Sequence, residues 1–232
     1  MELFDKLKNG LIVSCQAEGD DPFNSVEGVT LFAKAAVMGG AVGIRSRELE
    51  KTKAIVNCVD VPVIGLTKNY FEDGYVRITG SFKEVEEILS SNCNIIAVDG
   101  TFRLRENLSG PSFISEIKKR YKCFVMADIA EYEEGIACAD YGADCISSTL
   151  SGYTPNTKHY NKHTPDFKLV ENLATKLKIP IIAEGKINVP ESAKMLIENG
   201  AWAIVVGTAI TRPRIITSWF VEEIKNAKTL KE

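Results

Sequence analysis

The chain has 232 residues, of which 45% are hydrophobic, with a formal net charge of -3 and a pI near 5.6. This length and apolar content predict one domain over 1–232 with a sizeable core. The acidic balance and the scattered lysines and arginines exclude a broad basic surface, so we expect no nucleic-acid partner. No segment approaches the roughly 20 apolar residues of a membrane helix, and no signal peptide is recognisable, so we expect a cytoplasmic protein without membrane contacts.

Short apolar runs alternate with segments of helical periodicity along the chain. The runs predicted to be strands are 11–14, 41–44, 61–66, 95–98, 123–127, 145–148, 180–183 and 203–206. The predicted helices are 27–38, 52–59, 82–90, 111–121, 132–141, 166–177, 190–199 and 213–228, and 75–79 is predicted to be an additional short strand. This alternation predicts a parallel sheet in the α/β class, and the count of strands favours a single (β/α)8 TIM barrel over an open doubly wound sheet.

Polar residues follow the predicted strands at the ends where a barrel carries its active site. In chain order they are Gln16, Arg45, Lys68, Asp99, Asp128, Ser148, Thr149, Glu184 and Thr208. Because these ends meet at one face of a barrel, we expect the side chains to converge on a single cavity.

Lys68 and Glu184 follow the third and seventh predicted strands, which lie on opposite sides of an eight-stranded circle. Two ionisable groups on opposite walls can address both faces of one carbon, as inversion of a C–H centre by deprotonation and reprotonation requires. Lysine serves as a base only if its pKa falls toward neutrality, through burial or a neighbouring cation such as Arg45. The alternative is a structural ion pair between Lys68 and Glu184 or Asp128.

Two glycine-bearing strand ends predict a phosphate site. Gly185 and Gly207, followed by Thr208, can present backbone N–H groups without a Cβ in the way. The helix beginning near Pro213 is expected to point its positive end at the same place, and Lys186 is a candidate charge partner. Alternatively, the glycines only permit tight turns.

The remaining conspicuous residues predict little chemistry of their own. The six cysteines contain no Cys-x-x-Cys pair, so we expect reduced, mostly buried thiols. His159 and His163 have no further ligands near them in the sequence, so we expect no metal site. Trp219, in the last predicted helix, is expected in core packing or a subunit interface.

Seven signatures at the strand ends, spread over nearly the whole chain, closely resemble the N-acylmannosamine-6-phosphate 2-epimerase family of sialic acid catabolism. In chain order they are LIVSCQA (11–17), GIR (43–45), PVIGLTK (62–68), MADIA (126–130), STLSGYT (148–154), AEGKI (183–187) and VGTAITRP (206–213). An ordered set of this kind is more specific than any single phosphate-binding motif.

The resemblance implies interconversion of N-acetylmannosamine 6-phosphate and N-acetylglucosamine 6-phosphate, with no cofactor and no metal. Lys68 and Glu184 match the catalytic residues of the family, and the substrate-positioning groups match Gln16, Arg45, Asp128 and Arg212. Ring opening would expose an aldehyde at C1 and acidify the C2 proton. Asp128 is then expected to hold Lys68 or a sugar hydroxyl, and Arg45 to stabilise negative charge on oxygen.

Two other functions are compatible with the residues. Lys68 can instead form a Schiff base in an aldol or decarboxylation reaction on a phosphorylated substrate. The second alternative is a barrel that binds sugar phosphates without turning them over, although binding alone does not require two opposed acid/base groups. Apolar patches on the outer helices of barrels often mediate pairing, so a homodimer is a further expectation.

Overall fold

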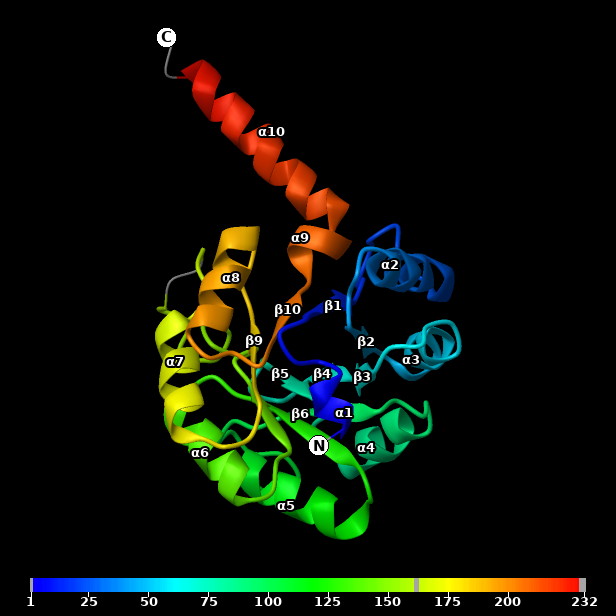
Figure 1. Ribbon diagram of the computed structural model, residues 1–232, viewed down its shortest axis with the longest axis vertical. Coiled ribbons are helices and arrows are strands. Elements are labelled where there is room, and N and C mark those ends of the chain that lie inside the picture. The colour runs from blue at the N-terminus through cyan, green and yellow to red at the C-terminus, as the bar shows by residue number, and fades with distance from the viewer. Residues whose placement is uncertain (1, 161–162, 230–232) are drawn as a thin grey trace.

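The computed structural model describes residues 2–160 and 163–229, and its strands form a closed parallel barrel (Figure 1). Around the barrel from the first strand, the order is β1 (Leu11–Cys15), β2 (Gly43–Arg47), β3 (Val63–Leu66), β6 (Ile95–Asp99), β7 (Phe124–Asp128), β8 (Cys145–Ser147), β9 (Ile181–Glu184) and β10 (Ala203–Val206). β10 pairs with β1 and closes the ring. The predicted barrel is therefore confirmed, with small shifts at the strand ends.

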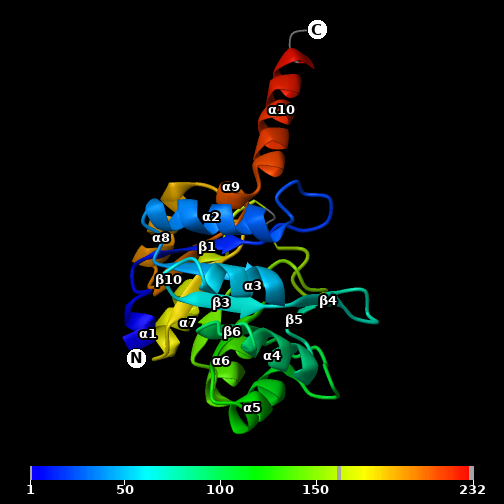
Figure 2. The ribbon, with the colours of Figure 1, turned by 90° about the vertical axis from the view of Figure 1, so that its right-hand side faces the viewer.

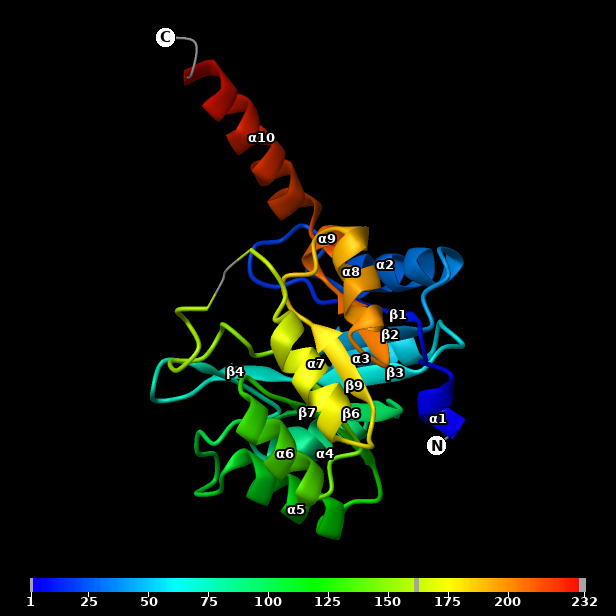
Figure 3. The same ribbon diagram turned by 60° about the vertical axis from the view of Figure 1, so that its left-hand side comes forward.

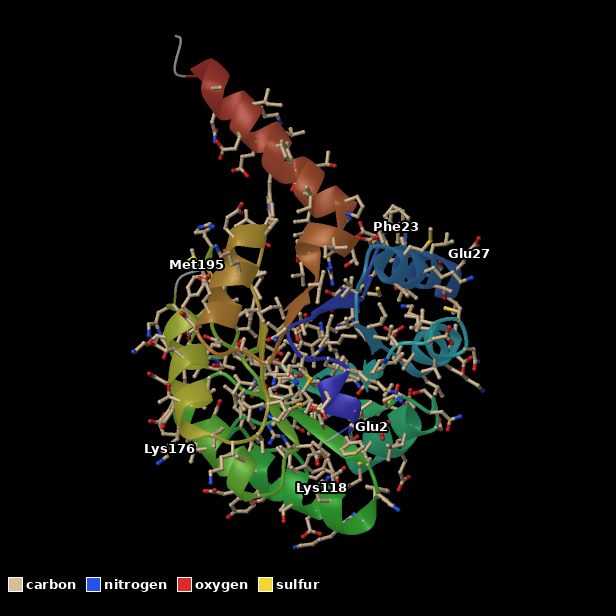
Figure 4. All side chains as sticks on the ribbon, viewed as in Figure 1. Glu2, Phe23, Glu27, Lys118, Lys176 and Met195 are labelled. Atoms are coloured by element: carbon tan, nitrogen blue, oxygen red, sulfur yellow. The ribbon has the colours of Figure 1, made fainter. Side chains whose placement is uncertain are left out.

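Helices cover the outside of the barrel (Figure 1). They are α2 (Val26–Met38), α3 (Leu49–Val56), α4 (Phe82–Leu89), α5 (Gly110–Arg120), α6 (Tyr132–Asp140), α7 (Phe167–Lys176) and α8 (Pro190–Glu198). Side chains that accept backbone N–H groups fix several starts: Ser25 caps α2, Ser81 caps α4 and Asp166 caps α7. Lys176 lies at the periphery of this helical layer (Figure 4), whereas the ammonium group of Lys118 is turned toward the start of β7 and pairs with Asp144 at 2.7 Å.

The period-two alternation of each strand decides what faces the barrel interior. Ile12 of β1 and Met126 of β7 belong to the apolar cluster inside the barrel, which α1 (Glu2–Asp5) joins through Phe4. Two residues further along the same faces come Ser14 and Asp128, both buried. The interior therefore changes from apolar to polar toward the C-terminal ends of the strands.

A two-stranded antiparallel hairpin follows β3 and projects from one end of the barrel (Figures 2 and 3). It consists of β4 (Lys68–Tyr70) and β5 (Val76–Ile78). β5 confirms the additional strand predicted at 75–79, whereas its partner β4 was not anticipated. Lys68 is paired across the hairpin with Ile78, so the hairpin and β3 together fix its position.

The C-terminal helix differs from the prediction in its placement. A short helix, α9 (Thr208–Thr211), lies between β10 and α10 (Pro213–Thr229), and α10 projects away from the barrel (Figures 1 and 3). The helix start that adjoins Gly207 is therefore that of α9, while α10 begins at Pro213 beside Arg212, which lines the cavity described below. A contribution of the α10 start to the phosphate site stays a prediction. None of the helices described here is both long and apolar enough to cross a membrane.

An apolar hollow of about 460 Å³ opens on the barrel wall beside α8. Residues from β1, β10, α8 and α9 line it, among them Leu11, Ile197, Val206 and Ile210. In a complete helical ring, the helix after the last strand would cover this part of the wall. Here it remains open because α10 extends away from it (Figure 1).

Candidate active site

A cavity of about 630 Å³ lies at the C-terminal ends of the strands. Its walls come from β1 and the segment after it, the β4–β5 hairpin, the segments after β8, β9 and β10, and α10. The predicted site residues that line it are Gln16, Lys68, Glu184, Gly185, Lys186, Gly207, Thr208 and Arg212. Trp219 also borders this cavity and is 39% exposed, so it does not pack in the core, and the other expectation, a subunit interface, stays a prediction.

Arg45 and Asp128, the other two predicted site residues, are fully buried and form a bidentate ion pair. Nη2 of Arg45 donates to Oδ2 of Asp128 at 2.5 Å, and Nη1 donates to Oδ1 at 3.0 Å. Nη1 also lies 2.8 Å from Oε2 of Glu184. Asp128 therefore holds Arg45, and the expected pairing of Asp128 with Lys68 is replaced by this contact.

Burial and opposite charges act against each other at Arg45. Burial disfavours the guanidinium cation, but Asp128 and Glu184 outweigh it and raise the pKa of Arg45. The cation is permanent, so Arg45 fixes two carboxyl groups at the base of the site. This arrangement orients Glu184 from beneath, because the inward face of β2 presents Arg45 toward β7 and β9.

Of the two carboxyl groups paired with Arg45, that of Glu184 reaches the cavity, with 14% of its side chain exposed. Burial raises its pKa above the usual value; Arg45 opposes the shift and Asp128 adds to it. The Glu184 carboxyl thus holds a proton to higher pH than an exposed glutamate does. The direction agrees with the predicted role of a residue that is protonated part of the time.

Thr149 connects the two carboxyl groups. Its hydroxyl lies 2.7 Å from Oδ1 of Asp128 and 3.0 Å from Oε2 of Glu184. The hydroxyl has one proton to donate, so it cannot donate to both oxygens at once. A proton on Glu184 satisfies both contacts, because Glu184 then donates to Thr149 while Thr149 donates to Asp128. Sequence analysis named Thr149 as a polar strand-end residue but gave it no role.

Lys68 lines the same cavity from the hairpin side. Burial lowers the pKa of Lys68 below its usual value. The carboxylates of Glu18 and Glu184 oppose this shift, whereas the cations of Arg45 and Arg47 add to it. A lowered pKa makes neutral lysine, the form that accepts a proton, more abundant at a given pH. β3 and β9 are four strands apart around the ring, so Lys68 and Glu184 approach the cavity from opposite walls as predicted.

Glu18 is a site residue that sequence reasoning missed. It lies in the segment after β1 and lines the cavity, and its carboxylate pairs with Arg47 at 2.6 Å and with Arg212 at 2.7 Å. Nη2 of Arg212 also donates to the carbonyl of Gln16 at 2.7 Å. The only available signal in the sequence was an acidic residue two positions beyond Gln16.

The predicted phosphate residues occupy one corner of the cavity. Gly185 has φ +106° and Lys186 has φ +59°, so the chain turns sharply after β9. Nζ of Lys186 donates to the carbonyl of Ser151 at 3.0 Å and lies 5.2 Å from the ring centre of Tyr153. Burial lowers the pKa of Lys186, and Asp166 opposes this shift.

Gln16 presents an unused acceptor in the same cavity. Its Nε2 donates to the Ser14 hydroxyl at 2.9 Å, while Oε1 is buried and has no hydrogen-bond partner among the described residues. A buried acceptor without a donor is unfavourable in a free protein. A ligand hydroxyl or amide can supply that donor, which fits the predicted role of Gln16 in substrate binding.

The barrel and its mouth together define an enzyme of the class that acts on small anionic molecules. The cavity brings cations, two carboxyl groups and glycine-bearing turns together at the catalytic face of the fold. Ionisable groups with shifted pKa values on opposite walls are typical of acid/base chemistry. Comparison with known proteins identifies the family.

Residues 29–226 match the family model described as "Putative N-acetylmannosamine-6-phosphate epimerase", and the chain belongs to this family. Proteins from Clostridioides difficile (strain 630) and Caldanaerobacter subterraneus carry the name "Putative N-acetylmannosamine-6-phosphate 2-epimerase". The first is 46% identical over 223 residues, covering 96% of this chain and 99% of the relative. The second is 46% identical over 230 residues, covering 98% and 96%.

A solved structure agrees with the sequence relatives. The N-acetylmannosamine-6-phosphate 2-epimerase from Clostridium perfringens superposes with a TM-score of 0.87 at 40% identity, covering 94% of this chain and 95% of that chain. The family resemblance stated from the sequence is therefore confirmed.

Proposed function

We propose that this chain interconverts N-acetylmannosamine 6-phosphate and N-acetylglucosamine 6-phosphate, in sialic acid breakdown, with Lys68 and Glu184 as the acid/base pair at C2. Family membership supports the reaction: its members are 2-epimerases, which are isomerases acting on an amino-sugar phosphate. The assignment of the residues rests on the geometry of this chain. The 232 residues are proposed to act as one catalytic domain.

The observation that carries the residue assignment is the opposition of Lys68 and Glu184 across one cavity, with pKa values shifted in complementary directions. A lysine of lowered pKa serves as the base that accepts the C2 proton. A carboxylic acid of raised pKa serves as the donor that returns a proton from the other face. In the reverse direction the two groups exchange roles.

The chemistry requires an open-chain substrate. An aldehyde at C1 makes the neighbouring C2–H acidic, and loss of that proton leaves an enolate whose negative charge resides mainly on the C1 oxygen. Arg45 lies beneath Glu184 and supplies a permanent positive charge near that position. The unused acceptor of Gln16 is available to a hydroxyl or the acylamino N–H of the substrate. Return of a proton to the opposite face of C2 gives the epimer.

The phosphate group is proposed to bind at the turns after β9 and β10. Gly185 and Gly207 leave their backbone N–H groups unobstructed, and Thr208 and Lys186 border the same corner. A Cβ atom added at Gly207 would lie 3.4 Å from the Cβ of Ser14, so glycine keeps this corner open. A doubly charged phosphate favours a corner that offers backbone N–H groups and has a lysine at its border.

Proton NMR in deuterated water tests this proposal. Chelator-treated protein is mixed with N-acetylmannosamine 6-phosphate, and both product formation and the C2 proton signal are followed. Appearance of N-acetylglucosamine 6-phosphate with deuterium at C2 is the expected result. Absence of both conversion and exchange would refute the reaction for this chain.

Two variants separate the residue assignment from the reaction itself. Lys68→Met and Glu184→Gln remove one proton carrier each, and each is expected to reduce kcat by about 10²–10⁴-fold. Borohydride treatment in the presence of substrate tests Schiff-base chemistry at Lys68, because only an imine is trapped by reduction. A trapped adduct, or full activity in either variant, would contradict the proposed pair.

We further propose that the protein forms a homodimer through α10. Phe220 is 68% exposed and Ile224 is 60% exposed on one side of this helix, which projects into solvent (Figure 4). The apolar hollow beside α8 is the matching surface, since it is the part of the barrel wall that the chain's own α10 leaves open. A second copy can cover the hollow with its α10, and the exchange is reciprocal under two-fold symmetry.

Size-exclusion chromatography with light scattering tests this pairing. The wild-type protein is expected to have the mass of two chains, and Phe220→Glu with Ile224→Glu is expected to have the mass of one. Glu222 lies on the opposite side of α10, so Glu222→Gln is the matched control and should keep the mass of two chains. A monomeric wild-type protein would refute the dimer.

A cytoplasmic location is also proposed, because all six cysteines are free thiols.

A further inference from the structure

Glu18 joins two arginines at the wall of the cavity. Its Oε2 lies 2.6 Å from Nη1 of Arg47, and its Oε1 lies 2.7 Å from Nη2 of Arg212. The three side chains come from different elements: the segment after β1, the end of β2 and the residue after α9. The carboxylate of Glu18 therefore crosslinks the mouth of the barrel.

Arg212 depends on such a partner for a defined position. Arginine has a long side chain with several rotatable bonds, and fixing it costs conformational entropy. Here one amino group of its guanidinium is held by two acceptors, the carboxylate of Glu18 and the carbonyl of Gln16. Arg212 lines the cavity in this position, as do Glu18 and Gln16. The loss of Glu18 would leave one of the two acceptors.

Glu18 and Lys68 line the same cavity, and Arg47, which the Glu18 carboxylate holds, also donates to the backbone carbonyl of Lys68 at 3.4 Å. Glu18 thus places a negative charge on the Lys68 side of the cavity. The other charged groups that act on Lys68 are Arg45 and Arg47 from β2 and Glu184 from β9. Glu18 itself remains ionised: burial disfavours its charge, but Lys68, Arg212 and Arg47 outweigh burial and lower its pKa. Glu18 is therefore a persistent counter-charge for the proposed base.

We propose that Glu18 is a positioning residue of the epimerase site, which fixes the guanidinium of Arg212 for the substrate and balances the charge of Lys68. This inference rests on the proposed function, because it assigns Arg212 and Lys68 their roles in that reaction. Glu18 acts through these two cations and takes no part in the proton transfer.

The two roles of Glu18 predict two separable effects. Without its carboxylate, Arg212 has fewer productive positions, so substrate binding weakens and KM rises. Removal of the negative charge also lowers the pKa of Lys68 further, because Glu18 is the charge that most strongly opposes the effect of burial. Neutral lysine is then available at lower pH, and the rising limb of the pH–rate profile shifts to lower pH.

Glu18→Gln tests the proposal because the amide keeps the size of the side chain and removes its charge. We expect KM to rise about fivefold, since the ion pair with Arg212 is partly exposed. The rising limb of kcat against pH is expected to move to lower pH. Glu18→Asp keeps the charge and is expected to restore the position of the limb.

Asp20→Asn is the matched control. Asp20 lies on the same segment and pairs with Arg214 at 2.7 Å, but both side chains are exposed and neither lines the cavity. Wild-type KM and pH profile are expected. Equal effects in Asp20→Asn and Glu18→Gln would overturn the proposal, because they would indicate general disturbance of the segment.

A double variant shows whether Glu18 acts through Arg212. In an Arg212→Ala background, Glu18→Gln is expected to leave KM unchanged while the shift of the pH limb persists. A further fivefold rise of KM in that background would refute the first role. An unmoved limb in Glu18→Gln would refute the second.

Labelling without substrate separates this inference from the proposed function. The pH dependence of acetic anhydride labelling at Lys68, read by mass spectrometry, reports its pKa in wild-type protein and in Glu18→Gln. Labelling at lower pH in the variant is expected, and equal profiles would overturn the charge role. If the wild-type protein shows no turnover while the labelling profile still shifts, the proposed reaction fails and the charge effect of Glu18 on Lys68 stands.

Discussion

Asp128→Asn probes the buried ion pair under the active site. The wild-type carboxylate accepts two hydrogen bonds from Arg45 and one from Thr149, and neither Asp128 nor Arg45 is exposed to water. The asparagine amide places an NH₂ group against the guanidinium, where both groups are donors. Arg45 then keeps Glu184 as its only carboxyl partner.

The cost follows from the burial of Arg45. Removing one partner of a buried pair destabilises a protein by about 3–5 kcal/mol, because the remaining charge is left uncompensated. Glu184 lies 2.8 Å from Arg45 and offsets part of this loss, so we expect a value near the lower end, about 3 kcal/mol. For a chain of this length, that corresponds to a fall in Tm of about 6–12 °C.

Urea unfolding followed by circular dichroism measures this change, and a thermal scan gives the Tm. Glu171→Gln is the control, because it breaks the exposed pair of Lys168 and Glu171 and should leave Tm unchanged. A fall in Tm of less than about 2 °C for Asp128→Asn would refute the reasoning, since a buried charge that loses a partner at no cost would have to be hydrated.

Three further outcomes concern individual residues. Lys68→Met is expected to raise the free energy of unfolding at pH 7 by about 0.5–2 kcal/mol, because the folded state no longer buries an ammonium group. Burial lowers the folded-state pKa of Lys68, so the penalty is full below that pKa and disappears above the unfolded value near 10.4. The advantage of Lys68→Met in urea unfolding should therefore shrink at high pH. Lys186→Ala is expected to raise KM for the sugar phosphate about tenfold with little change in kcat, as steady-state kinetics would show. Gly185→Ala is expected to cost about 1–3 kcal/mol by thermal unfolding, because φ is +106° there while the nearest atom to the added Cβ is 3.7 Å away.

Each of these outcomes has a result that contradicts it. If the free energies of unfolding of Lys68→Met and wild-type protein differ by a constant amount from pH 7 to above pH 10.4, burial does not lower the pKa of Lys68. A selective loss of kcat in Lys186→Ala would place Lys186 in the chemical step. An unchanged Tm in Gly185→Ala would mean that the turn after β9 relaxes to a conformation open to alanine.

The sequence by itself determined the barrel. Apolar runs such as 95–98 are buried on both faces, and their alternation with helical segments leaves few other arrangements of a chain of this length. It also determined which strand ends carry chemistry, because a charged residue directly after an apolar strand, such as Glu184, stands out in the pattern. The family followed from those same strand ends.

Only the tertiary structure decided the partners of these residues. Asp128 and Arg45 are 83 positions apart and meet because β7 and β2 present alternate side chains to one interior. Glu18, Arg47 and Arg212 come from three distant segments, so no local pattern could reveal their contact. Local periodicity specifies which face of an element is apolar, whereas packing decides which partner that face or charge meets.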